Sequence, residues 1–137
     1  MLVKEVMSKK PNYLPPTATL KQVGAAMLKN DFGFLPIGEN DRLIGAVTDR
    51  DITIRAVAKG KDPNKTRVKD VLTKKVLYCY ENDDIQKAIK NMSKQHVHRL
   101  IVLNTKKRMT GVFSLTDLAR KCRDTMVCGS ALKWIHH

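Results

Sequence analysis

The sequence contains few aromatic residues and few cysteines. Three Phe, three Tyr and one Trp give too little ring surface for an obvious base-stacking platform. The three cysteines, Cys79, Cys122 and Cys128, lack the spacing of metal ligands and cannot all pair with one another. We therefore expect reduced thiols with a mostly structural role.

Long apolar segments are also absent. No run of about 18 or more apolar residues occurs, which argues against a membrane-spanning helix. The N-terminal stretch MLVKEVMSKK lacks the apolar core of a signal peptide, so the cytoplasm is the expected compartment. Apolar residues still make up 42% of the 137 residues, which favours a folded globular protein with one compact domain or two small repeats.

Positive charge, in contrast, is abundant. A total of 26 Lys and Arg against 13 Asp and Glu gives a formal net charge of +13. This charge favours anionic partners such as nucleotides, nucleic acid or acidic proteins, although a solvated lysine-rich surface has the same composition. The charge is spread over both halves, +5 for residues 1–67 and +8 for residues 68–137, without a long basic tail. Nucleic-acid binding is therefore an alternative and not the primary expectation.

The sequence is written twice, with an offset of 65 to 66 residues. VKEVM at residues 3–7 returns as VKDVL at residues 68–72. GAVTDRD at residues 45–51 returns as GVFSLTD at residues 111–117. The change of offset by one residue falls where an insertion is tolerated, which locates a turn in each copy.

Each copy is predicted to follow the order strand, helix, strand, strand, helix. Extended stretches at residues 13–15 and 77–79 come first, and the turns GENDR and NTKKR are typical of β-hairpins. Thr17 and Asn82 are the expected N-caps of the first helices, and Gly60 is expected to end a later one. The apolar faces predicted for the first helices consist of Leu20, Val23, Met27 and Leu28 in one copy and Ile85, Ala88, Ile89 and Met92 in the other.

These elements predict an α/β (α+β) fold class, with two β-α-β-β-α repeats packed about a pseudo-twofold axis. Each repeat is too small to bury its apolar faces alone, so we expect a shared core and two equivalent clefts. We leave His136 and His137 out of the functional argument, because terminal histidines are typical of a purification-tag remnant. The predicted boundaries are 1–60 for the first repeat, 61–67 for the linker, 68–124 for the second repeat and 125–137 for the tail.

The repeated motif places a hydroxyl three residues before a carboxylate, where a strand passes into a helix. The pairs are Thr48 with Asp51 and Ser114 with Asp117. A hydroxyl at such a junction can bond a phosphate oxygen, and the carboxylate can accept hydrogen bonds from ribose hydroxyls. The preceding glycine leaves room for close approach. Ordinary helix capping uses the same residue types, but two copies in matched settings favour ligand binding.

The ordered and duplicated motifs resemble the cystathionine-β-synthase (CBS) domain. The resemblance rests on the doubled glycine–Ser/Thr–Asp pattern, the VKEVM and VKDVL openings and the VHRLIV stretch, and it covers about residues 1–123 as a tandem pair, or Bateman module. It implies a non-catalytic sensor of AMP, ADP, ATP or S-adenosylmethionine, held in clefts between the repeats, with no required cofactor. Asp51 and Asp117 would hold ribose, and Thr48 and Ser114 would approach phosphate.

The same resemblance implies further contacts that differ between the copies. His98 and Arg99 match a phosphate-facing pair, whereas the first copy has Gly33 and Phe34 there. Arg50 has no basic counterpart, so the two sites should differ in phosphate recognition. The adenine would lie against the backbone of Tyr13, Leu14, Leu77 and Tyr78, with Val47 and Phe113 nearby.

Other expectations concern partners and chemistry. By resemblance, a homodimer is expected, with an unknown regulated protein as a further partner. Catalysis in this family usually belongs to an attached domain, for which 137 residues leave no room, so no enzyme activity is predicted. His96 and His98 lack further ligands nearby in sequence, and no metal site is predicted. The alternative function is a basic interaction module that binds nucleic acid or an acidic protein.

Overall fold

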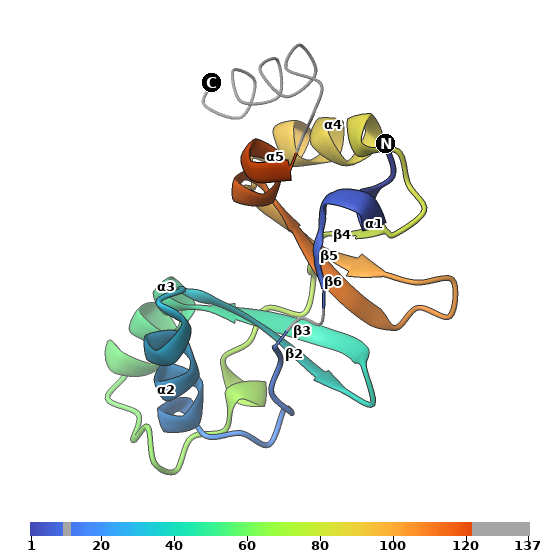
Figure 1. Ribbon diagram of the computed structural model, residues 1–137. Helices are drawn as coiled ribbons and strands as arrows, with labels where there is room; N and C mark the ends of the chain where they lie inside the picture. Colours follow the sequence, from blue (N-terminus) through green and yellow to red (C-terminus); the bar gives the residue numbers. More distant parts are fainter. Residues whose placement is uncertain (10–11, 122–137) are drawn as a thin grey trace. The chain divides into compact units, whose positions relative to one another are not determined.

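The computed structural model describes residues 1–9 and 12–121. The predicted tail, Cys122, Cys128 and the terminal histidines lie outside the described residues. Helices alternate with six β-strands in the described part of the chain, which confirms the predicted α/β class (Figure 1). No helix in this part is long and apolar enough to cross a membrane.

The described residues form two compact units that exchange their leading segments. One unit contains residues 12–76 and is called the Thr48 unit, and the other contains residues 1–9 with 77–121 and is called the Ser114 unit. Residues 1–9 therefore pack with the second copy, and residues 68–76 pack with the first. The predicted boundaries concern the sequence repeats and not these packing units, and they stay a prediction. The pseudo-twofold axis and the clefts between the repeats stay predictions.

The Ser114 unit is built on a four-stranded sheet of order β1-β6-β5-β4 (Figure 1). Strand β4 runs parallel to β5, and the other pairs are antiparallel. The short β1 comes from the leading segment, so the first copy completes the sheet of the second. The elements of this unit are α1 (Val3–Val6), β1 (Ser8–Lys9), β4 (Tyr78–Tyr80), α4 (Ile85–Gln95), β5 (Arg99–Leu103), β6 (Met109–Ser114) and α5 (Leu115–Lys121).

The Thr48 unit repeats this layout in a reduced form. Its two strands pair antiparallel, and isolated bridges extend them on both sides, Leu14 to Ile37 and Thr73 to Ala46. The extended stretch predicted at residues 13–15 is thus a single bridge, whereas its counterpart forms β4. The elements are α2 (Leu20–Asn30), β2 (Phe34–Glu39), β3 (Arg42–Thr48), α3 (Asp49–Ile52), the π-helical η1 (Thr53–Val57) and the 3₁₀-helical η2 (Val68–Asp70).

The first helix of each copy starts two residues later than predicted. The N-cap of α2 is Thr19, not Thr17, and its side chain exchanges hydrogen bonds with Gln22 in a capping box. The residue three positions after Thr17 is Leu20, whose side chain has no group that could accept a hydrogen bond from the Thr17 amide. The N-cap of α4 is Asp84, not Asn82.

The predicted apolar faces are borne out fully in α4 and only partly in α2. All four predicted residues of α4 are buried, whereas α2 buries Leu20 and Val23 and leaves Leu28 84% exposed. The prediction was wrong for Leu28, because at roughly 100° per residue it lies about 140° around the helix from Val23.

The hairpin turn and the helix end predicted for the first copy are both confirmed. Asn40 and Asp41 have φ values of 51° and 64°, which is typical of a two-residue hairpin turn. Gly60 has a φ of 68° and follows η1, where its amide donates to the carbonyl oxygen of Val57.

Each unit encloses its own hydrophobic cluster, and the exchanged segment closes it. Val3, Val6 and Met7 enter the cluster around Phe113, and Val68 and Val71 enter the cluster around Ile37. A copy without the other's leading segment would expose this apolar surface. The exchange therefore explains how units of this small size bury a core.

Candidate functional site

The Thr48 motif forms a complete capping box at the junction of β3 and α3. The amide of Asp51 donates to Thr48 Oγ1 at 3.1 Å, and the amide of Thr48 donates to Asp51 Oδ2 at 3.0 Å. Capping and ligand binding appeared as competing interpretations of the sequence. The structure shows capping directly, and any ligand would use the lone pairs that remain on these oxygens.

Asp51 has two further partners within its unit. The Arg55 guanidinium lies 3.6 Å from Asp51 Oδ1, and the Thr73 hydroxyl lies 3.4 Å from Asp51 Oδ2. Arg55 also donates to Thr73 Oγ1 at 3.0 Å and to the carbonyl oxygen of Val71 at 2.9 Å. The carboxylate remains 16% exposed and carries a nearby compensating charge.

The Ser114 motif holds its carboxylate with hydroxyl groups. Ser114 Oγ donates to Asp117 Oδ2 at 2.9 Å and accepts from the Asp117 amide at 3.1 Å. Ser8, from the exchanged segment, donates to Asp117 Oδ1 at 2.7 Å. Asp117 is only 5% exposed, and in the described part of the chain it has no ion-pair partner. An ionised group buried in this way depends on its hydrogen bonds.

The motif glycines make room for the chain itself. A Cβ atom at Gly45 would lie 2.7 Å from the Thr73 carbonyl oxygen, and one at Gly111 would lie 2.7 Å from Met7 Sδ. The space predicted for close approach of a ligand is therefore filled by the exchanged segments, which pair with β3 and β6 at these points.

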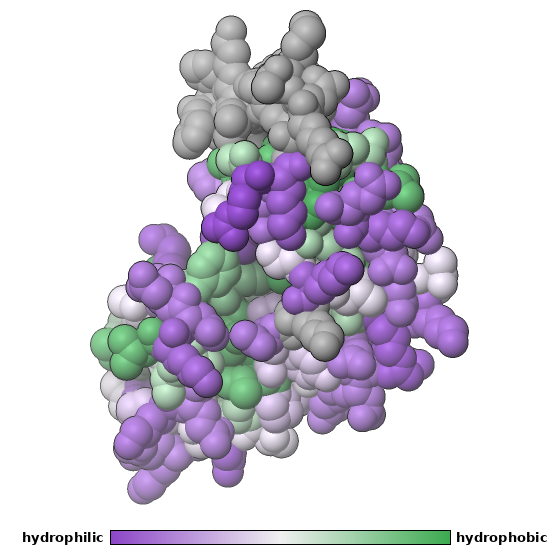
Figure 2. All heavy atoms as spheres, in the orientation of Figure 1, coloured by the Kyte–Doolittle hydropathy of each residue, from purple (hydrophilic) through white to green (hydrophobic). Residues whose placement is uncertain are grey.

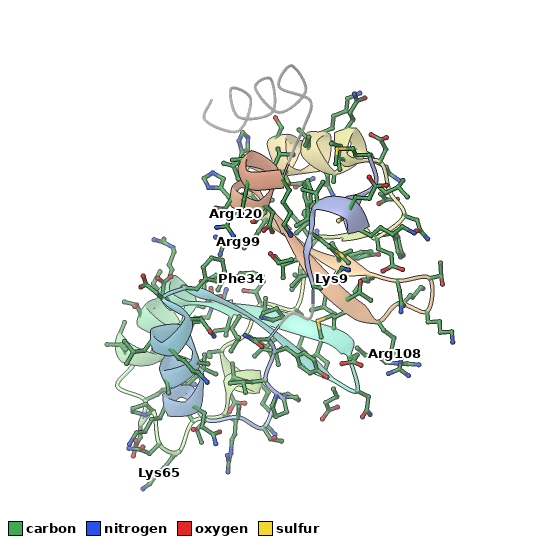
Figure 3. The ribbon with its side chains drawn as sticks, in the orientation of Figure 1. Lys9, Phe34, Lys65, Arg99, Arg108 and Arg120 are labelled. Atoms are coloured by element: carbon green, nitrogen blue, oxygen red, sulfur yellow. The ribbon has the colours of Figure 1, made fainter. Side chains whose placement is uncertain are left out.

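The neighbours of the two motifs differ in charge. Arg99 pairs with Ser114 across β5 and β6, whereas Phe34 pairs with Thr48 across β2 and β3. Figure 3 shows Arg99 at the start of β5 and Phe34 at the start of β2. Arg99 is half-buried, and this desolvation lowers its pKa. The Ser114 motif thus has an adjacent cation with a fork of donors, and the Thr48 motif has an aromatic ring in the same position.

The other residues predicted to meet phosphate lie close to these motifs. His98 is exposed, and its carbonyl oxygen accepts from the amide of Leu115 at 2.9 Å. Arg50 is exposed on α3, and its amide donates to Asp49 Oδ1 at 2.8 Å. The structure therefore brings His98 and Arg99 to the start of α5, and Arg50 to the start of α3.

Two residues predicted near the adenine belong to the cores. Val47 and Phe113 are each 0% exposed, so neither presents surface to a ligand in this conformation. Their placement near the adenine was an implication of the family resemblance. Alternation along the strand, however, turns them to the opposite face from Thr48 and Ser114.

The predicted adenine-reading backbone is largely engaged in strand pairing. The Leu14 amide donates to the Pro36 carbonyl oxygen at 3.3 Å, and the Leu14 carbonyl oxygen accepts from the Gly38 amide at 3.0 Å. Leu77 accepts from the Ile101 amide at 3.4 Å. The hydrogen bonds that were predicted to read the adenine edge at Leu14 are thus used within the sheet.

The two tyrosines of this prediction behave differently. The Tyr13 hydroxyl donates to Asp41 Oδ1 at 2.8 Å and accepts from the Asp41 amide at 2.9 Å, which ties the extended stretch to the hairpin turn. Tyr78 is 45% exposed, and its ring stands at 87° to that of Tyr80. Tyr78 therefore keeps a ring surface that a base can contact.

The sequence analysis did not predict four residues that lie near the motifs. Ser8 and Thr73 follow VKEVM and VKDVL directly, and a basic residue follows each motif Asp by four positions, Arg55 and Lys121. Lys121 Nζ donates to the carbonyl oxygen of Met7 at 3.3 Å. The signal was present as matched residues in the two copies, but their contacts cross from one copy to the other.

No group of three His, Cys, Asp or Glu side chains within the described ranges is arranged to hold a metal ion. His96, one of the two histidines considered for such a site, has a φ of 56° and caps the C-terminus of α4.

Comparison with known proteins decides the family. The CBS-domain family model matches residues 3–57 and 68–124. The chain belongs to the CBS-domain family. Its two CBS domains stand in tandem, as the sequence resemblance implied.

Relatives of this CBS-domain pair include proteins with bound ligands. Hypoxic response protein 1 of Mycobacterium tuberculosis is 36% identical over 103 residues, which cover 74% of this chain and 71% of that protein. A crystal structure of hypoxic response protein I with two coordinated zinc ions has a TM-score of 0.77 at 31% identity, with coverage of 88% and 98%. The CBS domain pair of protein MJ0100, in complex with 5′-methylthioadenosine and S-adenosyl-L-methionine, has a TM-score of 0.74 at 25% identity and covers 88% and 98%.

Proposed function

We propose that this CBS-domain pair is a non-catalytic regulatory module that binds an adenosine-containing ligand at its two motifs. In this proposal, Asp51 and Asp117 accept from ribose hydroxyls, and Thr48 and Ser114 lie near the phosphate or its replacement. AMP, ADP, ATP and S-adenosylmethionine are the candidate ligands. The relative MJ0100 supports this class, since its CBS domain pair was crystallised with two adenosyl compounds.

The main support within the chain is the placement of Arg99 beside the Ser114 motif. The strand register sets Arg99 opposite Ser114, whose hydroxyl donates to the buried carboxylate of Asp117. A guanidinium binds phosphate oxygens in a bidentate manner, and a carboxylate accepts from ribose hydroxyls. These three groups match the two polar parts of a nucleotide. Arg50 and His98 are exposed near the motifs and are proposed as additional phosphate contacts.

Calorimetric titration of the whole chain with AMP, ADP, ATP and S-adenosylmethionine tests this function. We expect Asp51→Asn and Asp117→Asn each to weaken binding at one site, because the amide loses one acceptor oxygen. Lys106→Ala, in the exposed turn between β5 and β6, is a control for a substitution outside both motifs. Circular dichroism must show that the variants remain folded.

Two results would contradict the proposal. One is that the wild-type protein binds none of the four ligands, and the other is that both Asp variants bind them with wild-type affinity. A polynucleotide affinity that falls steeply with salt and is indifferent to Asp51 and Asp117 would instead favour the basic interaction module.

We also propose that the module is a homodimer that uses apolar residues of the Thr48 unit. Leu28 is 84% exposed and Val57 is 68% exposed, and Figure 2 shows apolar surface among polar residues over the helices of this unit. The position equivalent to Leu28 in the second copy is Ser93. Sedimentation velocity should therefore show dissociation for Leu28→Glu and no change for the control Ser93→Glu.

A further inference from the structure

The exchanged segments bring a hydroxyl to each motif from the other copy. Ser8 belongs to the first copy and bonds Asp117 of the second, whereas Thr73 opens the second copy and approaches Asp51 of the first. Ser8 and Thr73 are equivalent, since they lie 65 residues apart and follow the matched VKEVM and VKDVL stretches. The crossed contact is thus built twice.

Backbone pairing fixes both hydroxyls in place. Ser8 pairs with Val112, directly before Phe113, and Thr73 pairs with Ala46, directly before Val47. The Thr73 amide and carbonyl both bond Ala46, at 2.8 and 2.9 Å. The motif glycines Gly45 and Gly111 allow this approach, because a Cβ atom at either would collide with the segment. Backbone pairing therefore fixes the positions from which the two hydroxyls reach the carboxylates.

The two carboxylates are oriented by different donors. At Asp117, Ser8 bonds Oδ1 and Ser114 bonds Oδ2, so two hydroxyls together fix the plane of the carboxylate. At Asp51, Arg55 approaches Oδ1, and Oδ2 accepts from the Thr48 amide with Thr73 at a longer distance. Within the described residues, Ser8 is the only donor to Oδ1 of Asp117. The corresponding oxygen of Asp51 has Arg55 as its partner.

We infer that Ser8 and Thr73 are positioning residues of the two ligand sites, each supplied by the opposite copy, with Ser8 the more important of the two. This inference rests on the proposed function. Without Ser8, the Asp117 carboxylate can rotate about its Cβ–Cγ bond and no longer presents its free lone pairs in one direction. Without Thr73, Asp51 still has Arg55 and the Thr48 amide. Binding at the second motif thereby depends on the start of the first copy.

The binding test uses the full chain and titrates adenosine and AMP as probes. We expect Ser8→Ala to weaken binding at the Asp117 site about tenfold, the effect of losing one hydrogen bond to a charged group. Ser8→Thr keeps the hydroxyl and should restore affinity to within about twofold, which a merely structural loss would not explain. Thr73→Val should weaken the Asp51 site less than about threefold, because its hydrogen bond is long. Lys9→Ala, in the same strand, is the control.

A second test needs no ligand. In urea unfolding, Ser8→Ala should lower the equilibrium constant for folding of the wild type about tenfold, but should change it little in an Asp117→Ala background, where the acceptor is gone. Additive losses would overturn the inference, whether or not a ligand binds. Wild-type binding that Ser8→Ala leaves unchanged would also overturn it while leaving the proposed function intact. If the wild-type protein binds no adenosine compound, the proposed function fails. The positioning role in binding then fails as well, even if the stability losses of the Ser8 and Asp117 variants are not additive.

Discussion

Asp51 and Asp117 occupy equivalent positions in the two copies but differ in what surrounds them. Asp51 is partly exposed and lies beside Arg55, whereas Asp117 is buried and held by Ser8 and Ser114. Asp117 forms no ion pair within the described residues, and burial of such a carboxylate is costly, so its hydrogen bonds matter more than those of an exposed one. Two copies of one motif thus keep the same hydroxyl–carboxylate geometry, although one carboxylate is stabilised by an ion pair and the other by hydrogen bonds from hydroxyl groups.

The largest expected effect that tests this comparison is on stability. Asp117→Ala removes the acceptor of two hydroxyls in a buried setting, and we expect it to lower the free energy of unfolding by about 2–4 kcal/mol. Asp51→Ala removes a partly exposed cap and should cost only about 1 kcal/mol. Urea unfolding followed by circular dichroism measures both, and equal losses would show that the difference in burial has no energetic consequence.

The next effect concerns ligand choice and exchanges the residues that distinguish the motifs. Arg99→Phe gives the Ser114 motif the neighbour of the other copy, and Phe34→Arg does the reverse. We expect Arg99→Phe to reduce the preference for AMP over adenosine about tenfold at the Asp117 site, because a phosphate loses a charged partner. Phe34→Arg should raise that preference at the Asp51 site. Calorimetry with the two ligands separates these outcomes, and an unchanged AMP-to-adenosine ratio in both variants would contradict the role of Arg99.

The smallest effect is a pH dependence confined to the Ser114 unit. Burial, with the nearby Asp83 as a lesser cause, raises the pKa of the Cys79 thiol from 9.0 to about 12. Because the folded protein disfavours the thiolate, the stabilising contribution is fully present below about pH 9 and is lost as the pH rises toward about 12. The equivalent residue in the Thr48 unit is Leu14, which does not titrate.

The measurement compares wild type with Cys79→Ala by urea unfolding at pH 8 and pH 10.5. We expect the difference in stability between the two proteins to shrink at the higher pH. A difference that stays constant would contradict the raised pKa. Mass-spectrometric mapping of alkylation should also show that Cys79 reacts more slowly in the folded chain than in urea, because the reactive thiolate is suppressed.

Much of the local structure followed from patterns in the sequence. The repeat, the hairpin turn at Asn40 and Asp41 and the buried face of α4 depend on periodicity and turn chemistry, which are local properties. Errors arose where local patterns were ambiguous. Thr17 and Thr19 are both suitable caps by residue type, and only the return bond from Gln22 decides between them. Leu28 is apolar but lies at the edge of its helical face.

The strand–helix junctions that carry the two motifs were predictable from the sequence, but the contacts of the motif residues were not. Thr48, Asp51, Ser114 and Asp117 stand at strand–helix junctions as predicted, and Arg99 and Phe34 are their register partners. Val47 and Phe113 turned out to be core residues, since strand alternation places them on the face opposite the motif hydroxyls.

Repetition and spacing are properties of the linear chain, and they are enough to define a doubled CBS pattern with one hydroxyl–carboxylate motif in each copy. The packing of each copy's leading segment with the other copy, in contrast, is visible only in the folded chain. Edge pairing of β1 with β6 and of Thr73 with Ala46 joins residues that are far apart in the chain. No local preference encodes such a crossing, and it follows from the need of each small unit to close its sheet and bury its core.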